Sequence, residues 1–256
     1  MRRQRRRHLS TDAGRIVLPS CPSTMTVARD GFAGYAGPTW VLALRQTGGH
    51  GRRGRPWANP AGAFTATLAL PNPGTAQAAA QRSFVAALAL FDAFVAVTGR
   101  PEGLSLKWPN DVLLNGGKVA GILLESLGPR PDGTLDGLLI GIGVNLIEPP
   151  DVGEVEPAAV RPVALAQEAG VRVAPEEFLD VLAPAYARHE ASFATHGFGP
   201  IRRAWLDRAA RLGEVITARL PGEALTGTFK TIDEMGYLQL QTKTGLRGIA
   251  AGEVFF

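Results

Sequence analysis

Hydrophobic positions recur along this chain at two different spacings, and each spacing predicts one type of element. Apolar and small or hydroxyl-bearing residues alternate in Phe64–Leu70, which is typical of a strand with one buried face. In Gln77–Thr98 the large apolar residues recur every three or four positions, which predicts a helix that ends at Gly99. Its longest apolar run is shorter than the ~20 residues that span a membrane, and Asp92 interrupts it. We therefore expect a buried core helix.

Further β-prone runs flank this helix on both sides. Strands are predicted at Ile16–Leu18, Trp40–Thr47, Leu104–Trp108, Val112–Leu114, Val119–Glu125 and Leu138–Asn145. The sequence Asn115-Gly116-Gly117 is typical of the turn of a β-hairpin, so the strands on either side of it should pair. Helices are predicted from Ser23 or Thr24 towards Tyr35 and within residues 158–208.

The pattern changes near Leu212-Gly213. Short β-prone runs follow at Val215–Leu220, Thr226–Ile232, Tyr237–Gln241 and Leu246–Ala250. Several short strands separated by turn residues predict a small β-barrel. We therefore expect residues 15–211 to form the larger domain and residues 212–256 a small second one.

The 256 residues carry a formal net charge of +4, but this charge is not spread over the chain. Five of the 27 Lys and Arg residues stand at positions 2, 3, 5, 6 and 7, which leaves 22 against 23 Asp and Glu. A run of like charges at a terminus is usually solvated, so residues 1–14 are predicted to be a disordered basic tail. The near-neutral remainder argues against a nucleic-acid-binding module, which normally carries a basic face.

Cysteine and histidine limit the chemistry further. Cys21 is the only cysteine, which excludes an intramolecular disulfide and fits a reducing cytoplasm. The four histidines show no metal-ligand spacing, so we expect no metal site of the protein's own.

Residues 48–57, here called the Gly-Arg loop, read GGHGRRGRPW and belong to a long segment without periodicity. They contain G-x-G-x-x-G, but no helix pattern follows and no acidic residue occurs between Asp30 and Asp92, which excludes a dinucleotide-binding turn. Arg55 and Pro56 stand where a P-loop needs Lys and Ser or Thr. Glycines let backbone N–H groups approach a ligand, and arginines donate to phosphate or carboxylate. Composition alone leaves open an enclosed anion site or an RNA-binding patch.

A second cluster, Lys107-Trp108-Pro109-Asn110-Asp111, combines a cation, an aromatic ring, an amide and a carboxylate. Pro109 restricts its own φ and the conformation of Trp108, so the neighbouring side chains have set directions. If the strands beside the hairpin turn pair, Asp111 and Lys118 lie near the same end of the sheet. A simple ion pair at the rim would show the same pattern and contribute little.

Taken together, these segments resemble the biotin protein ligases in content and in order. The Gly-Arg loop is similar to that family's GRGRRGR followed by an aromatic, with His50 in place of an arginine. Other matching segments are Lys107–Asp111 (KWPND), Lys118–Glu125 (K-x-A-G-I-L-x-E), Gly141–Leu146 (G-x-G-x-N), Pro22–Thr24 (part of STN) and Gly252–Val254. Met25 replaces the asparagine of STN, which leaves Ser23 and Thr24 to carry its role. The resemblance covers about residues 15–256.

This resemblance implies an α+β fold with a central mixed β-sheet and helices, similar to class II aminoacyl-tRNA synthetases and the biotin–lipoate ligase core. An SH3-like β-barrel would follow at the C-terminus. The implied activity is a ligase that converts biotin and ATP to biotinyl-5′-AMP. It would then pass the biotinyl group to a lysine of a biotin carboxyl carrier protein, such as an acetyl-CoA carboxylase subunit. The Gly-Arg loop would keep water from the reactive adenylate.

The resemblance also implies roles for single residues. Lys118 would stabilise charge at the reacting phosphate, Asp111 would orient or deprotonate the acceptor amine, and Arg52 would complete the catalytic set. Biotin would contact Ser23, Thr24, Gln46, Gly49, His50, Gly51, Arg52, Lys118 and Gly121. ATP and the adenylate would contact Arg52, Arg55, Trp57, Lys107, Asn110, Asp111 and Asn145. Mg²⁺ would bind through the ATP phosphates rather than in a protein cage.

Several expectations about partners follow. About 14 residues precede the first predicted core strand, too few for a helix-turn-helix module, so we expect no DNA binding and no repressor role. We expect a cytoplasmic monomer or homodimer that does not bind membranes. Two rival functions are a lipoate-protein ligase or octanoyltransferase, which shares the core, and a nucleic-acid-binding module. The Gly-Arg loop together with KWPND argues against the first rival, and the near-neutral charge of the chain outside its tail argues against the second.

Overall fold

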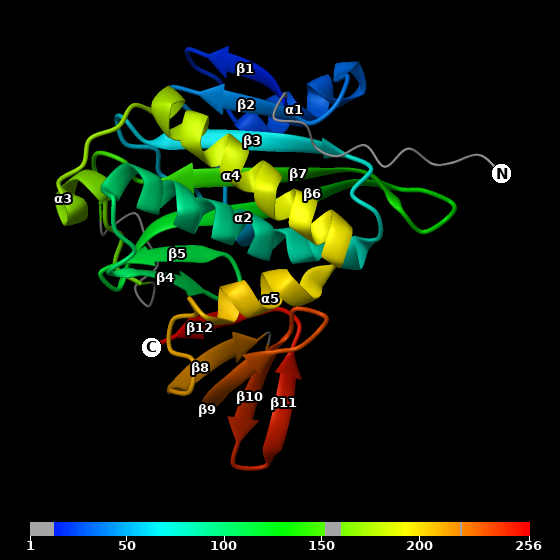
Figure 1. The fold of residues 1–256 in the computed structure, drawn as a ribbon, viewed down its shortest axis with the longest axis vertical. Helices are drawn as coiled ribbons and strands as arrows, with labels where there is room; N and C mark the ends of the chain where they lie inside the picture. Colours follow the sequence, from blue (N-terminus) through cyan, green and yellow to red (C-terminus); the bar gives the residue numbers. More distant parts are fainter. Residues whose placement is uncertain (1–12, 152–159, 221) are drawn as a thin grey trace.

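A computed structural model of the protein describes residues 13–151, 160–220 and 222–256. The predicted basic tail therefore lies outside the described residues, except for its last two positions. Two β-sheets and five α-helices form the described part, with the larger sheet in the N-terminal two thirds of the chain (Figure 1).

The larger sheet has seven strands in the order β1-β2-β3-β7-β6-β5-β4. Its strands are β1 (Gly14–Leu18), β2 (Thr39–Ala43), β3 (Phe64–Pro71), β4 (Leu104–Lys107), β5 (Asp111–Leu114), β6 (Gly117–Pro129) and β7 (Leu135–Val144). β1 and β2 are parallel, whereas every other neighbouring pair is antiparallel. The expected mixed central sheet is confirmed.

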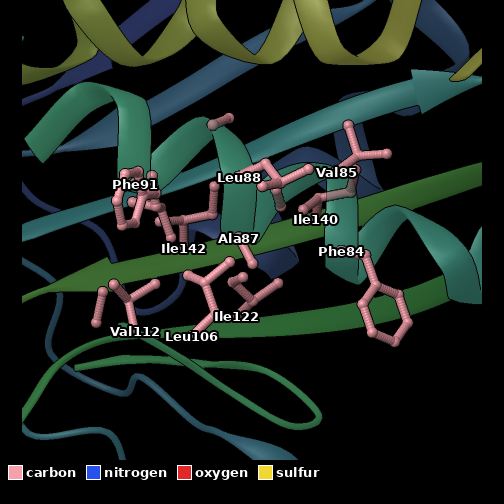
Figure 2. Packing of buried hydrophobic residues seen from close by; sticks show 14 of the residues in the cluster. Phe84, Val85, Ala87, Leu88, Phe91, Leu106, Val112, Ile122, Ile140 and Ile142 are labelled. Carbon is pink, nitrogen blue, oxygen red and sulfur yellow. The ribbon is translucent and has the colours of Figure 1, made fainter. Parts of the chain in front are cut away.

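Helices α2 (Ala76–Thr98) and α4 (Pro175–His196) cover one face of this sheet (Figure 1). The Thr75 hydroxyl caps the start of α2, and Gly99 ends it at a left-handed φ of 73°. Figure 2 shows side chains of α2 packed against apolar side chains of β4 to β7. Among the described residues α2 is the one helix long and apolar enough to cross a membrane. Because most of it is buried between the sheet and α4, α2 is a core helix.

The opposite face of the sheet is only partly covered. Helix α1 (Thr24–Gly31) and the short 3₁₀ helix η1 (Phe32–Gly34) pack on it. Met25 and Ala28 of α1 contact Val41, Ala69 and Leu139 of the strands. The rest of this face lies beside the Gly-Arg loop and borders a cavity.

The C-terminal part is a five-stranded antiparallel sheet in the order β11-β10-β9-β8-β12. Its strands are β8 (Val215–Leu220), β9 (Glu223–Ile232), β10 (Leu238–Thr242), β11 (Gly245–Ile249) and β12 (Glu253–Phe255), and they follow α3 (Leu165–Ala169), α4 and α5 (Phe198–Leu206). The turn between β9 and β10 contacts Trp108 and helix α2 of the larger, N-terminal part. There the Trp108 indole N–H donates to the Gly236 carbonyl at 3.1 Å, and Gln81 donates to the Glu234 carbonyl at 2.9 Å.

Several predicted elements have different bounds in the structure. The helix expected to run towards Tyr35 is α-helical to Gly31 and continues as the 3₁₀ helix η1 to Gly34, and Tyr35 is extended. The strand expected to reach Thr47 ends at Ala43, since its partner β3 begins at Phe64 and offers no further ladder. The strand predicted at Val119–Glu125 runs from Gly117 to Pro129, because β7 supplies pairing partners as far as Leu135.

Candidate active site

A cavity of about 360 Å³ opens on the partly covered face of the seven-stranded sheet. Its walls come from β3, β5, β6 and β7, from the start of α1, from the Gly-Arg loop and from β12. Cavities of this size are typical of small-molecule sites. The site therefore combines segments from both ends of the chain.

Strand β7 creates the hollow through its alternating side chains. Ile142 points into the core beneath α2, whereas Gly141 and Gly143 face the cavity without side chains. A Cβ atom at Gly143 would lie 2.4 Å from the Trp57 ring, and one at Gly141 would lie 2.8 Å from the Met25 sulfur. Both glycines are therefore needed for the close approach of a neighbouring side chain.

We expect Gly143→Ala to lower the free energy of unfolding by about 1–3 kcal/mol, because the added methyl displaces the rigid Trp57 ring. Gly141→Ala is the matched control on the same strand and face. Its methyl meets the flexible end of Met25, so the expected loss is smaller. Urea unfolding of the two variants measures the difference, and equal losses would contradict this account of the hollow.

Asp111 lies between two lysines at one wall of the cavity. Its Oδ1 is 2.7 Å from Lys118 Nζ, and its Oδ2 is 3.3 Å from Lys107 Nζ. Lys107 pairs directly with Asp111 across β4 and β5, around the cis Trp108–Pro109 bond. A register shift in the β5–β6 ladder places Lys118 opposite Leu113, and therefore on the same face as Asp111.

The two lysines also determine the charge of this carboxyl group. Burial would raise the pKa of Asp111, but Lys118 and Lys107 outweigh burial and hold that pKa below its usual value. Asp111 is therefore ionised at neutral pH and is a weak proton acceptor. This favours orientation of a cationic or amine group over proton abstraction.

The Gly-Arg loop folds back on itself above the cavity. The Gly51 N–H donates to the Arg55 carbonyl at 2.7 Å, and the Trp57 N–H donates to the Gly49 carbonyl at 2.9 Å. Between them η2 (Arg52–Gly54) directs Arg52 inward, where its Nη1 lies 3.4 Å from Asn110 Oδ1 and 3.2 Å from the Gly252 carbonyl. Burial lowers the pKa of the Arg52 guanidinium, while the nearby Asp111 carboxylate opposes this change.

Trp57 forms part of the cavity wall between β6 and β7. Lys118 Nζ lies 5.5 Å from the centre of its ring, within the range of a cation–π contact. Its indole N–H is buried and has no hydrogen-bond partner among the described residues. This N–H is consequently able to donate to a bound molecule.

The opposite end of the cavity is lined by hydroxyl and amide groups. Gln46 Oε1 accepts from the Thr24 backbone N–H at 2.8 Å and from the Thr24 hydroxyl at 3.1 Å. The Thr67 hydroxyl in turn donates to the Thr24 hydroxyl at 2.9 Å, and Ser23 lies beside them, buried. This connected network suits a small polar group in a fixed orientation.

Strand β12 contributes a carboxylate to the site. Arg55 lies 2.6 Å from Glu253 Oε1, and Arg53 lies 4.0 Å from Glu253 Oε2. Burial would raise the pKa of Glu253, but these arginines, Arg55 foremost, hold it below its usual value. Sequence reasoning matched Gly252–Val254 to a family segment but gave Glu253 no place in the site, since no local pattern shows that β12 reaches the loop.

With one exception, the predicted site residues line the same cavity. They are Ser23, Thr24, Gln46, His50, Gly51, Arg52, Arg55, Trp57, Lys107, Asn110, Asp111, Lys118, Gly121 and Asn145. The exception is Gly49, which lies behind the wall, where a Cβ atom would meet the Gln46 amide at 2.3 Å. Asn145 also has a structural contact, because its Nδ2 donates to the Val163 carbonyl at 3.0 Å.

Comparisons with known proteins agree with this geometry. Residues 17–145 match the model of the biotin/lipoate A/B protein ligase family, and residues 212–256 match that of the biotin protein ligase C-terminal domain. The chain is 56% identical over 240 residues to a biotin–[acetyl-CoA-carboxylase] ligase of Paracoccus denitrificans, covering 94% of this chain and 99% of the relative.

The chain is also similar to more distant ligases. The chain is 29% identical to the bifunctional ligase/repressor BirA of Bacillus subtilis, covering 84% of this chain and 65% of that protein. Among solved structures, it is similar to the biotin protein ligase of Aquifex aeolicus in complex with biotin and ATP. The two are 27% identical with a TM-score of 0.80, covering 94% of this chain and 97% of that one.

Proposed function

The chain belongs to the biotin/lipoate A/B protein ligase family, and we infer that it is an ATP-dependent biotin–protein ligase. One observation carries this reading: a cationic cluster and a polar amide–hydroxyl network face the same cavity from opposite ends. The first suits a phosphate and a carboxylate, and the second suits a ureido ring. A site for nucleotide and vitamin together needs both.

The reaction has two steps, and Lys118 is proposed to serve the first. A carboxylate oxygen of biotin bonds to the α-phosphorus of ATP, and pyrophosphate leaves. Lys118 is aimed at this region by its contact with Asp111, so its charge can stabilise the negative charge that develops on the phosphate oxygens. In the second step the neutral amine of an acceptor lysine attacks the carbonyl carbon, the bond from that carbon to the phosphate oxygen breaks, AMP leaves, and the amide nitrogen gives up a proton to solvent.

Asp111 is proposed to orient the acceptor amine in the second step. Its lowered pKa makes it a poor base but a stable anion, and the N–H of an approaching acceptor amine can donate to it in the place of one lysine. Asn110 lies next to it, held by a 2.7 Å hydrogen bond from its Nδ2 to the Ile122 carbonyl. This leaves the Asn110 oxygen directed towards Arg52.

The biotin end is proposed to lie at the Thr24–Gln46 network, with Ser23, His50, Gly51 and Gly121 around it. Gly49 would act through its neighbours, because it does not face the cavity. Met25, which takes the place of the family's asparagine, adds an apolar wall beneath Gly141.

The nucleotide end is proposed to include Arg52, Trp57, Lys107 and Asn145, with Arg55 beside Glu253. A phosphate would compete with Glu253 for the Arg55 guanidinium. The described residues hold no cluster of three or more acidic, His or Cys side chains that fits a metal ion. Mg²⁺ is therefore proposed to arrive with ATP on its phosphate oxygens.

Other features of the function are proposed more broadly. The acceptor is a biotin carboxyl carrier protein, in line with the acetyl-CoA carboxylase named for the Paracoccus relative. Residues 15–211 would be the catalytic domain, and residues 212–256 an SH3-like unit that completes the cavity wall through β12. A cytoplasmic location, a monomeric or dimeric state and the lack of DNA binding and membrane binding stay predictions.

Incubation with ATP, biotin and a carrier domain should attach biotin to a single carrier lysine and release AMP and pyrophosphate. Mass spectrometry of the carrier measures this directly, and omission of ATP is the control. Efficient attachment of lipoate or octanoate without biotin would favour the rival acyl ligase. Salt-dependent binding of RNA or DNA that ignores biotin and ATP would favour the nucleic-acid module.

A further inference from the structure

Glu125 ends the Lys118–Glu125 motif, yet the chemistry above gives it no role. Its Oε1 lies 3.0 Å from His50 Nε2 of the Gly-Arg loop, and its Oε2 accepts a hydrogen bond from Arg29 of α1. One carboxylate on β6 therefore joins three elements that border the cavity. The Glu125 side chain is only 25% exposed, so solvent screens these contacts less than it screens a surface ion pair.

His50 lies at the base of the Gly-Arg loop, where the two sides of the loop meet. It forms an isolated β-bridge with Pro56, and the next residue, Gly51, is bonded to Arg55. The other half of the loop is held separately, by the ion pair between Arg55 and Glu253. His50 and Glu125 thus attach the half of the loop nearest the Thr24–Gln46 network to the sheet.

The geometry points to Glu125 as a positioning residue: by holding His50, it keeps residues 49–51 closed over the biotin end of the cavity. This inference rests on the proposed function. It also accounts for the departure at position 50, because histidine and the family's arginine can each donate to the same carboxylate. Residue 50 then serves as a donor to Glu125 rather than as a phosphate ligand.

A double-mutant cycle tests this pairing with His50→Ala, Glu125→Ala and the combined variant. Each single change should weaken biotin binding about three- to tenfold, and should raise the KM for biotin more than it lowers kcat. The combined variant should be no worse than Glu125→Ala alone, because that single variant has already lost the contact with His50 as well as the one with Arg29. His50→Arg should bind biotin within about twofold of wild type, since arginine restores the donor.

Asp136→Ala is the matched control, because it breaks a 2.8 Å ion pair with Arg130 in the turn between β6 and β7, away from the Gly-Arg loop. It should leave biotin affinity unchanged. In the biotin complex, hydrogen exchange at residues 49–57 should accelerate in His50→Ala and Glu125→Ala but not in Asp136→Ala. Additive losses in the cycle, or unchanged biotin affinity in both single variants, would overturn the inference. Failure of the wild type to bind biotin would instead refute the proposed function.

Discussion

Replacing Lys118 by alanine should lower the rate of biotinyl-adenylate formation by about a hundredfold to a thousandfold. This is the usual loss when one preorganised donor to a developing negative charge is removed. Lys118 contacts both the Asp111 carboxylate and the face of Trp57, so its ammonium group is held at the junction of the proposed biotin and nucleotide ends. Pyrophosphate release in the absence of carrier protein measures this step alone.

The second half-reaction separates this role from general damage to the site. Supplied with ready-made biotinyl-5′-AMP, Lys118→Ala should transfer biotin to the carrier much closer to the wild-type rate, because the phosphate chemistry is already complete. Lys118→Arg keeps a cation and should recover part of the adenylation rate. If transfer from supplied adenylate fell as far as adenylation, Lys118 would act by holding Asp111 rather than by stabilising charge.

Most elements were predictable where local interactions determine them. The spacing of Phe84, Leu88 and Phe91 predicted α2, and the Asn115–Gly117 turn predicted the β5–β6 hairpin. The errors arose where a distant strand sets the length of an element. β2 ends near the first residues of its antiparallel partner β3, and β6 continues until it reaches the first residue of its antiparallel partner β7. No local pattern carries that information, because pairing partners lie tens of residues away along the chain.

In the candidate site, too, some contacts were predictable from the sequence and others were not. Motif spacing predicted that Asp111 and Lys118 would meet at one end of the sheet, and their 2.7 Å contact agrees. The register shift that directs Lys118 to the correct face could not be read from the hairpin turn alone. Trp108 was part of the predicted cluster, but its indole N–H contacts Gly236 in the C-terminal sheet. That contact depends on how the two sheets dock, which the sequence pattern does not show.

Contacts to the Gly-Arg loop were the least predictable. Its composition indicated an anion site or an RNA-binding patch, and residues of the loop line the cavity, which favours the first. The carboxylates that hold the loop are Glu125 of β6 and Glu253 of β12, and both lie far beyond the loop along the chain. A loop rich in arginine thus meets its counter-charges only after folding, which explains why no acidic residue is needed near it in sequence.

Replacing Arg52 by glycine should let the adenylate escape, raising its release rate about tenfold to a hundredfold. Hydrogen bonds to a charged partner contribute roughly 1.5–3 kcal/mol, and each 1.4 kcal/mol is a factor of ten. Arg52 points inward, between Asn110 and the Gly252 carbonyl, where it can bridge the intermediate to both walls. Escaped adenylate should label lysines of a bystander protein, which mass spectrometry can count after a single turnover.

Arg53→Gly is the control for this prediction, because it removes the same charge from the neighbouring position. Arg53 has a left-handed φ of 60°, which glycine adopts easily, and its guanidinium lies 4.0 Å from Glu253, a weak contact. Its adenylate release should therefore stay near the wild-type rate. Equal leakage from both variants would mean that the loop retains the intermediate through its overall charge. Unchanged release from Arg52→Gly would show that closure of this loop does not shelter the anhydride, even in an active ligase.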